Sequence, residues 1–193
     1  MRVGDSLTEL EGHFRALLSA TGEDPVREEL LKTPRRAAEA FRYFTKGYQQ
    51  DVATVLNKAI FETECDDMII VKDIEFYSLC EHHLVPFFGK CHVGYLPDGK
   101  IVGLSKIARL VEMFSRRLQV QERLTHEIAH ALEEAIQPRG VAVVMQARHL
   151  CMMRRGVEKQ GSQMVTSAVL GAFRERDRTR EEFMSLLRTD GRG

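Results

Sequence analysis

Two consecutive amphipathic helical patterns in the middle of the chain place the strongest limit on how this sequence can fold. Apolar residues recur at helical spacing from Ile107 to Leu118, behind a helix start at Ser105, and again from Leu124 to Ile136. Strand-like patterns lie on both sides of this pair, and more helical patterns lie towards the N-terminus. Strands that flank a central helix pair predict an α+β domain.

Capping residues and prolines divide the N-terminal part of the chain into short helices. The first helical pattern closes at Thr21-Gly22. Asp24-Pro25 and Thr33-Pro34 each place a capping side chain before a proline, which favours two more helix starts. The second of these helices should end near Gly47, and a further short helix is expected at residues 51–58.

The segments on either side of the helix pair predict strands and turns. Residues 60–71 indicate a strand, a turn at Cys65-Asp-Asp67 and a second strand. Residues 87–104 indicate a hairpin with its turn at Pro97-Asp-Gly99. The elements expected after the break at Pro138-Arg-Gly140 are a strand at residues 141–153, a strand at residues 163–173 and a helix from Thr179.

Composition and charge exclude several classes of protein. The chain carries 28 Lys and Arg against 28 Asp and Glu, so it has no net charge with which to coat nucleic acid or an anionic membrane. No apolar stretch approaches the roughly 18 residues that a membrane span needs, and the first residues do not lead into a signal core. We therefore expect a cytoplasmic protein whose 4 cysteines are free thiols or metal ligands.

Cysteine and histidine side chains in two segments indicate a metal site. Cys80-Glu-His82-His83 has the Cys-x-x-His spacing with which one tight turn supplies two zinc ligands. His149 and Cys151 are two residues apart on a predicted strand, so they should project from the same face. Cys80, His83 and Cys151 would form a three-ligand site that leaves a fourth position for water. The alternative is that the histidines belong to a loop and Cys151 is a core thiol.

A cluster of basic residues predicts an anion-binding site. Ser105 and Lys106 begin the first central helix, and Arg109 follows one turn later. The exposed amides and the positive end of the helix dipole favour an anion there. Arg154 and Arg155 directly follow the strand that carries the predicted metal ligands, so a polyphosphate bound by them would lie near the metal. The alternative is a solvated helix face with no ligand.

The segment His126-Glu-Ile-Ala-His130 matches the H-E-x-x-H signature of zinc proteases on a predicted helix. Helical projection places both histidines with Glu122 and Glu133 on the polar side of the helix, away from its apolar stripe. Glu158, in a charged loop, is the one candidate for a third ligand. A metallopeptidase is therefore the weaker alternative.

Longer motifs occur in a fixed order over roughly residues 30–190. They are Phe76-Tyr-Ser-Leu-Cys-Glu-His-His-Leu-Val-Pro-Phe-Phe-Gly89, Gly103-Leu-Ser-Lys-Ile107, Arg116-Arg-Leu-Gln-Val-Gln-Glu-Arg-Leu-Thr125, His149-Leu-Cys-Met152 and Arg155-Gly156. Together they resemble the GTP cyclohydrolase I family. The resemblance implies an N-terminal helical segment at residues 1–57 and a catalytic tunnelling fold (T-fold) at residues 58–193, an antiparallel sheet backed by the helix pair. It also implies a homo-oligomer, two stacked rings that form a decamer, with active sites between subunits.

The resemblance further implies roles for individual residues. It assigns zinc binding to Cys80, His83 and Cys151, and proton transfer to His82 and His149. It assigns recognition of the guanine edge to Glu122, with Gln121 beside it. It assigns triphosphate binding to Ser105, Lys106, Arg109, Arg155 and Arg36, with Arg36 coming from another subunit. Glu39 stands at a position where some relatives carry a basic residue. This difference bears on the outer end of the implied phosphate site.

The implied reaction opens the imidazole ring of GTP by hydrolysis at C8, releases formate and gives 7,8-dihydroneopterin triphosphate, a precursor of tetrahydrofolate. Zinc would make hydroxide available near neutral pH, and a protonated His149 would give a proton to N7. Two other readings stay open. One is a non-catalytic, zinc-stabilised assembly module, and the other is a tunnelling-fold relative that reduces a nitrile on a deazaguanine.

Overall fold

The computed structural model describes residues 6–57, 59–155 and 157–188. Lys58, at which we expected the second domain to begin, and Gly156 of the Arg155-Gly156 motif lie outside the described residues. The chain falls into two units, Met1–Lys46 and Gly47–Gly193. None of the described helices is both long and apolar enough to cross a membrane.

The first unit is built from two helices and a connecting loop. Its elements are α1 (Ser6–Ala20), the 3₁₀ turn η1 (Glu28–Leu30) and α2 (Thr33–Phe44). The rings of Phe14 and Phe41 join the two helices, with centroids 6.1 Å apart. The short helix expected after Asp24-Pro25 is reduced to the single 3₁₀ turn η1. The Asp24 carboxylate accepts a hydrogen bond from the Val26 N–H at 3.0 Å, and such a local bond favours a turn over a helix.

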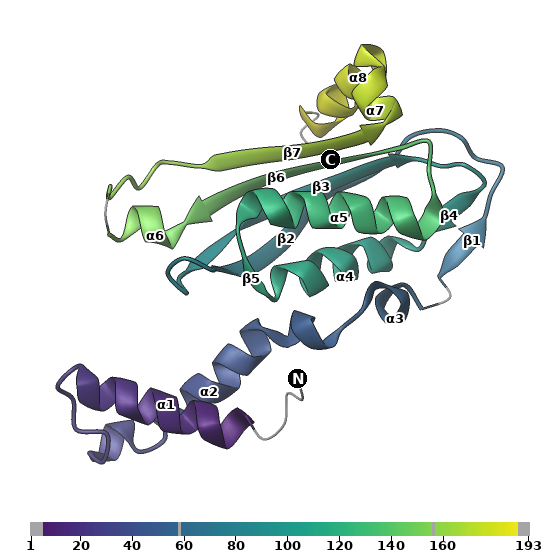
Figure 1. Ribbon diagram of the computed structural model, residues 1–193. Coiled ribbons are helices and arrows are strands. Elements are labelled where there is room, and N and C mark those ends of the chain that lie inside the picture. The colour runs from purple at the N-terminus through teal and green to yellow at the C-terminus, as the bar shows by residue number, and fades with distance from the viewer. Residues whose placement is uncertain (1–5, 58, 156, 189–193) are drawn as a thin grey trace, which may run out of the picture. The chain divides into compact units, whose positions relative to one another are not determined.

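A five-stranded sheet forms the centre of the second unit (Figure 1). In spatial order its strands are β5 (Leu118–Gln119), β2 (Ile69–Cys80), β3 (Pro86–Leu96), β6 (Gly140–His149) and β7 (Met164–Gly171). The long strands run antiparallel to their neighbours, whereas β5 pairs in parallel with the end of β2. This parallel pair joins Cys80 to Gln119 and so fixes the end of β2.

Two helices, α4 (Leu104–Ser115) and α5 (Gln121–Ile136), lie side by side on one face of the sheet (Figure 1). The apolar stripe of α5 is buried, since none of its four predicted side chains is more than 1% exposed. The expected α+β architecture, an antiparallel sheet backed by a helix pair, is confirmed. Leu118, which we expected in the first helix, lies in β5 because α4 ends at Ser115.

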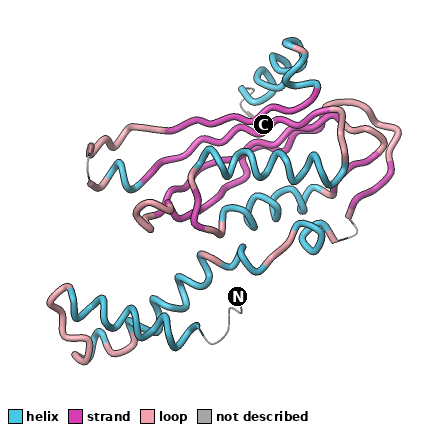
Figure 2. Tube along the Cα trace, in the orientation of Figure 1, coloured by secondary structure: helices cyan, strands magenta, loops and turns pink. Residues whose placement is uncertain are grey.

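The C-terminal helices α7 (Ala172–Glu175) and α8 (Asp177–Arg188) follow β7 (Figure 2). Phe173 and Phe183 are buried in a cluster with Ala142 and Val144 of β6, whereas Val143 belongs to the main core. Alternate residues of β6 therefore face opposite sides of the sheet, and both sides are covered. The expected strand to residue 173 ends at Gly171, and the closing helix starts two residues before Thr179.

The short helix α3 (Val52–Leu56) confirms the helix expected at residues 51–58, and the 3₁₀ turn η2 (Lys46–Gln49) precedes it. Asp51 caps α3, because its carboxylate accepts a hydrogen bond from the Thr54 N–H at 2.8 Å. Val55 and Leu56 are buried in the main core of the second unit. The helix that we placed at the end of the N-terminal segment thus packs with the sheet.

A second sheet pairs β1 (Ile60–Glu62) with β4 (Lys100–Val102). Gly99 has φ +75°, which agrees with the turn expected at Pro97-Asp-Gly99. The expected hairpin over residues 87–104 is nevertheless wrong, because β2 and β6 occupy both edges of β3. β4 must therefore find its partner elsewhere, and it pairs with β1.

β6 ends at His149, and the one-turn helix α6 (Leu150–Met153) follows. The prediction of a single strand at residues 141–153 is wrong. His149 is paired with Phe87, next to the first residue of β3, and β7 has already stopped pairing with β6 before this point. A continued strand would leave its backbone groups without partners, so the chain turns. His149 and Cys151 therefore lie on different elements.

Candidate metal centre

The Cys-x-x-His segment forms a closed turn at the end of β2. The Cys80 N–H donates to the Val85 carbonyl at 2.9 Å, and the Leu84 N–H donates to the Cys80 carbonyl at 2.8 Å. The Glu81 N–H donates to the Gln119 carbonyl at 3.0 Å, which ties the turn to β5. The backbone that carries Cys80 and His83 is thus fixed by its own hydrogen bonds.

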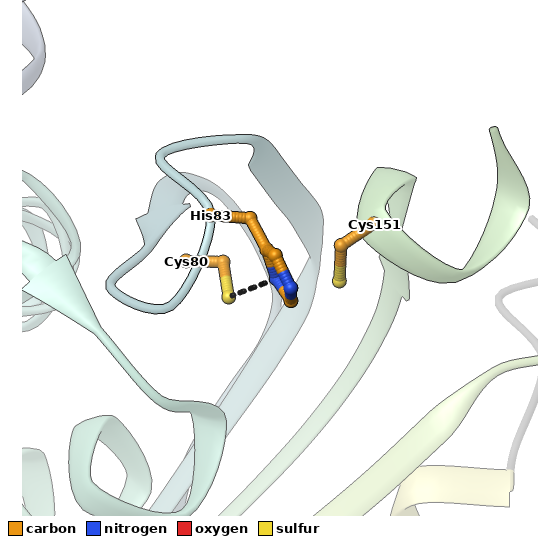
Figure 3. A group of neighbouring side chains, drawn as sticks. All are labelled: Cys80, His83 and Cys151. Atoms are coloured by element: carbon orange, nitrogen blue, oxygen red, sulfur yellow. Dashed lines mark hydrogen bonds between the residues drawn. The ribbon is translucent and has the colours of Figure 1, made fainter. Parts of the chain in front are cut away.

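Cys80, His83 and Cys151 come together although they lie on two distant segments (Figure 3). One ligand atom from each residue lies within 4.8 Å of the other two. The Cys80 Sγ and the His83 Nδ1 are 3.9 Å apart, close to the edge of roughly 3.6 Å expected between S and N ligands of a tetrahedral zinc ion. Cys80 is buried, Cys151 is half-buried and His83 is exposed. This group can hold a metal ion.

The electrostatics of the two thiols favour a cation between them. Burial, together with the nearby Cys80 thiol, raises the pKa of Cys151 above its ordinary value. Two thiolates this close repel each other, and a divalent cation would relieve that repulsion. The donor set of two thiols and one imidazole therefore fits a metal site that leaves room for one further ligand.

His149 lies beside this group with its ring held on two sides. The ring stacks on Phe87 with centroids 4.7 Å apart and an interplanar angle of 3°. Its Nε2 lies 2.8 Å from the Oε1 of Gln121, the first residue of α5. Burial lowers the pKa of His149, and the negative charge of Glu122 partly opposes this effect. Burial thus favours the neutral imidazole, and Glu122 favours the charged one.

The start of α5 and the turn after β2 bring one further predicted residue each to the same place. Glu122 is exposed in the first turn of α5, close enough for its charge to act on His149. His82 is exposed, and its Nδ1 lies 3.8 Å from the Cys80 Sγ. Most of the predicted catalytic, guanine-edge and metal-binding residues thus lie in one region. This region is formed by the end of β2, the end of β6, α6 and the start of α5.

The basic residues predicted to bind the triphosphate lie outside this region. Ser105, Lys106 and Arg109 lie in the first turns of α4, whereas its last residue, Ser115, leads towards β5 and Cys80. At a rise of 1.5 Å per residue, the start of α4 lies about 15 Å from that end. Within one chain, the predicted phosphate cluster and the metal group therefore lie at opposite ends of the helix layer.

Two other predicted arginines lie at the surface. Arg155 is exposed just after α6. Arg36 is exposed on α2, in the first unit. On the same helix, the Glu39 carboxylate accepts a hydrogen bond from the Arg35 Nε at 2.8 Å. Glu39 is thus engaged with its own helix.

A family model described as GTP cyclohydrolase I matches residues 10–188. The chain belongs to the GTP cyclohydrolase I family. GTP cyclohydrolase 1 of Methylococcus capsulatus is 62% identical to it, over 92% of this chain and 96% of that protein. GTP cyclohydrolase 1 of Homo sapiens is 57% identical, over 95% of this chain and 74% of that protein. The resemblance seen in the motifs is thus confirmed.

The tunnelling fold implied for the GTP cyclohydrolase I family is likewise confirmed by this membership and by the sheet with its helix pair. Among solved structures, the archaeosine synthase QueF-Like in the apo form is 17% identical to this chain. That match has a TM-score of 0.48 and covers 56% of this chain and 97% of the other.

Sequence reasoning missed the residues that support this candidate metal centre. Arg123 donates hydrogen bonds to Glu81 and, at 3.0 Å, to the Oε1 of Gln119, and so braces the metal-binding turn against α5. This ion pair lowers the pKa of Glu81. Phe87 supports His149 from the neighbouring strand. These residues lie inside the quoted motifs, but the motifs alone gave no sign of their supporting role.

The H-E-x-x-H segment does not form a comparable centre. His126 and His130 are exposed on α5, and the His130 Nδ1 lies 3.2 Å from the Glu133 carboxylate. Within residues 6–57, 59–155 and 157–188, the sole group with three clustered ligand atoms is Cys80, His83 and Cys151. A metallopeptidase is not favoured.

Proposed function

We propose that this chain hydrolyses GTP at C8 of the guanine ring, releases formate and forms 7,8-dihydroneopterin triphosphate. The observation that carries this proposal is the Cys80, His83 and Cys151 group beside His149 and Glu122, in a chain of the GTP cyclohydrolase I family. The site therefore combines a metal-binding group, an imidazole and a carboxylate within one small region.

The ion that we propose is zinc, held by Cys80, His83 and Cys151, because two thiolates and an imidazole are preferred zinc donors. When bound, zinc would act as a Lewis acid and lower the pKa of water towards neutrality. The ligand thiols must stay reduced for this, so we expect the protein to work in a reducing compartment such as the cytoplasm.

The proton transfers fall to the two histidines. His149, half-buried and held by Phe87 and Gln121, is placed to exchange a proton with the imidazole ring of the substrate. His82 is exposed beside Cys80 and can exchange protons with solvent as the ring opens. The two histidines thus differ in solvent access, which suits one to the substrate and the other to water.

Glu122 would select guanine. Its carboxylate can accept hydrogen bonds from the N1–H and the N2 amino group of guanine, and these two donors are missing from the corresponding edge of adenine. Bound ATP would cover the Glu122 carboxylate without giving it a hydrogen-bond donor, which is costly, so ATP should be rejected. This assignment uses the exposed position of Glu122 at the start of α5.

The triphosphate would be bound between subunits. Ser105, Lys106 and Arg109 surround the positive end of α4, which favours an anion. Because this end lies about 15 Å from the end of α4 next to the metal group, a second copy of the chain must supply these residues to the site. We propose a ring-shaped homo-oligomer, expected to be a decamer, with Arg155 and Arg36 as further phosphate contacts.

Incubation of the purified, zinc-loaded protein with GTP tests the function. We expect stoichiometric formate and a fluorescent pterin after oxidation, with ATP giving neither product. Zinc bound without any product would favour the assembly-module alternative. Turnover that depends on a nicotinamide cofactor would favour the nitrile reductase instead.

Glu122→Gln should lower kcat/KM for GTP by roughly 10- to 100-fold, because hydrogen bonds to a charged acceptor contribute a free energy of about that size. Zinc content should be unchanged, because Glu122 is not among the three clustered ligands. Steady-state kinetics with GTP measure the effect, and Glu134→Gln, an exposed carboxylate further along α5, is the matched control. Unchanged kinetics in the Glu122 variant would remove its role in guanine binding.

A further inference from the structure

Gln121 has a side-chain amide whose orientation is fixed by its surroundings. The residue is 1% exposed. Its Nε2 donates to the Met145 carbonyl at 3.2 Å, the Met164 carbonyl at 3.1 Å and the Thr166 Oγ1 at 3.1 Å. Backbone carbonyls only accept hydrogen bonds, so the amino group must face them. The Oε1 atom must therefore point the other way, towards His149.

This orientation determines which nitrogen of His149 carries a hydrogen. An amide oxygen only accepts, so the His149 Nε2, 2.8 Å away, must be the donor. The requirement is the same for the neutral and the charged ring. Within the described part of the chain, the His149 Nδ1 has no hydrogen-bond partner. Nδ1 is thus the ring nitrogen that remains available for a contact with the substrate.

The support of Gln121 extends one layer further. The Thr125 hydroxyl donates to the Gln121 carbonyl at 2.7 Å, and the hydroxyls of Thr125 and Thr166 are 2.7 Å apart. Thr125 uses its hydrogen on the Gln121 carbonyl, so Thr166 donates to Thr125 and accepts from Gln121. Each member of this buried network therefore has a consistent role, which favours a single rigid arrangement.

We propose that Gln121 is a positioning residue that acts through His149. It holds the imidazole with the hydrogen on Nε2, so that Nδ1 is the ring nitrogen available to the substrate. This inference rests on the proposed function, and it replaces the direct guanine contact expected for Gln121, because both ends of the amide are already bonded inside the protein. Glu122 alone would then read the guanine edge.

A double-mutant cycle on the zinc-loaded protein tests the inference. Gln121→Met keeps the length of the side chain but removes both hydrogen-bonding ends. We expect kcat to fall about 100-fold, at the lower end of what acid–base catalysis contributes, with KM for GTP changed less than about threefold. His149→Ala should lose at least as much. The variant with both changes should be no slower than His149→Ala alone, because Gln121 acts only through the imidazole.

Gln146→Met is the matched control, because it makes the same change at an exposed glutamine of β6. Its kcat should stay within about threefold of wild type. A purely structural role of Gln121 would make the double variant slower than His149→Ala alone. Losses that multiply in the double variant, or a rise in KM with kcat unchanged, would overturn the inference.

A second measurement depends neither on turnover nor on the folding of Gln121→Met. ¹⁵N NMR of ring-labelled histidine in the wild-type protein, with the His149 signals assigned by their loss in His149→Ala, should show a hydrogen on Nε2. A hydrogen on Nδ1 with a bare Nε2 would overturn the inference. If wild type forms no product from GTP but the Nε2 tautomer is found, the proposed function fails while the positioning by Gln121 stands.

Discussion

Cys151→Ser is expected to abolish both metal binding and turnover of GTP. A serine hydroxyl does not ionise near neutral pH, so it cannot replace the thiolate that closes the group with Cys80 and His83. Loss of the metal removes several kcal/mol of transition-state stabilisation, so kcat should fall by at least about 10³-fold. Elemental analysis of the purified protein and a formate assay on the same sample measure the two losses.

Cys65→Ser is the control for this experiment, because Cys65 is an exposed thiol outside the metal group. It should keep wild-type zinc content and activity. Full turnover by the Cys151 variant, or by wild-type protein stripped of metal, would contradict a catalytic role of the centre. Zinc retained by the variant at wild-type affinity would show that the ligand set is wrong.

The second large effect concerns stability. Gly89 lies in β3 opposite Ala147 of the neighbouring strand β6. A Cβ at this position would lie 1.9 Å from the Gln146 carbonyl oxygen and 2.8 Å from the Ala147 Cα. Both neighbours are backbone atoms of β6 and cannot move aside without breaking the strand pair. Gly89→Ala should therefore lower the free energy of unfolding by about 3 kcal/mol or more.

The same substitution should reach the metal centre, because β6 carries His149 and leads directly into α6 with Cys151. Any Gly89→Ala protein that folds should bind zinc more weakly than wild type. Denaturant unfolding and zinc titration measure the two effects. Gly161→Ala, where a Cβ would meet nothing within 4 Å, is the control. Equal stability of the two variants would mean that the β3–β6 contact is looser than described.

The helix pair and half of the metal group could be predicted because their signals are local. The apolar stripe from Leu124 to Ile136 is a property of one segment, and every predicted side chain in it is buried. Cys80 and His83 are joined by a single turn, so their spacing alone indicates a shared ligand role.

The remaining features depend on contacts between distant segments. The pairing of β4 with β1 follows from both edges of β3 being taken, and no pattern within residues 87–104 carries that information. Cys151 was expected beside His149 on one strand face, yet it reaches the metal group from a helical turn. The bond between Gln121 and His149 likewise joins α5 to β6, and a buried glutamine gives no sign in the sequence of what it holds.

The chain supports the two halves of the metal group unequally. Backbone hydrogen bonds close the turn of Cys80 and His83, and Arg123 braces it from α5. Cys151 sits in a one-turn helix beyond the last paired residue of β6. The turn of Cys80 and His83 therefore keeps its shape without help from Cys151. A substitution that loosens α6 should weaken the Cys151 ligand and leave that turn intact.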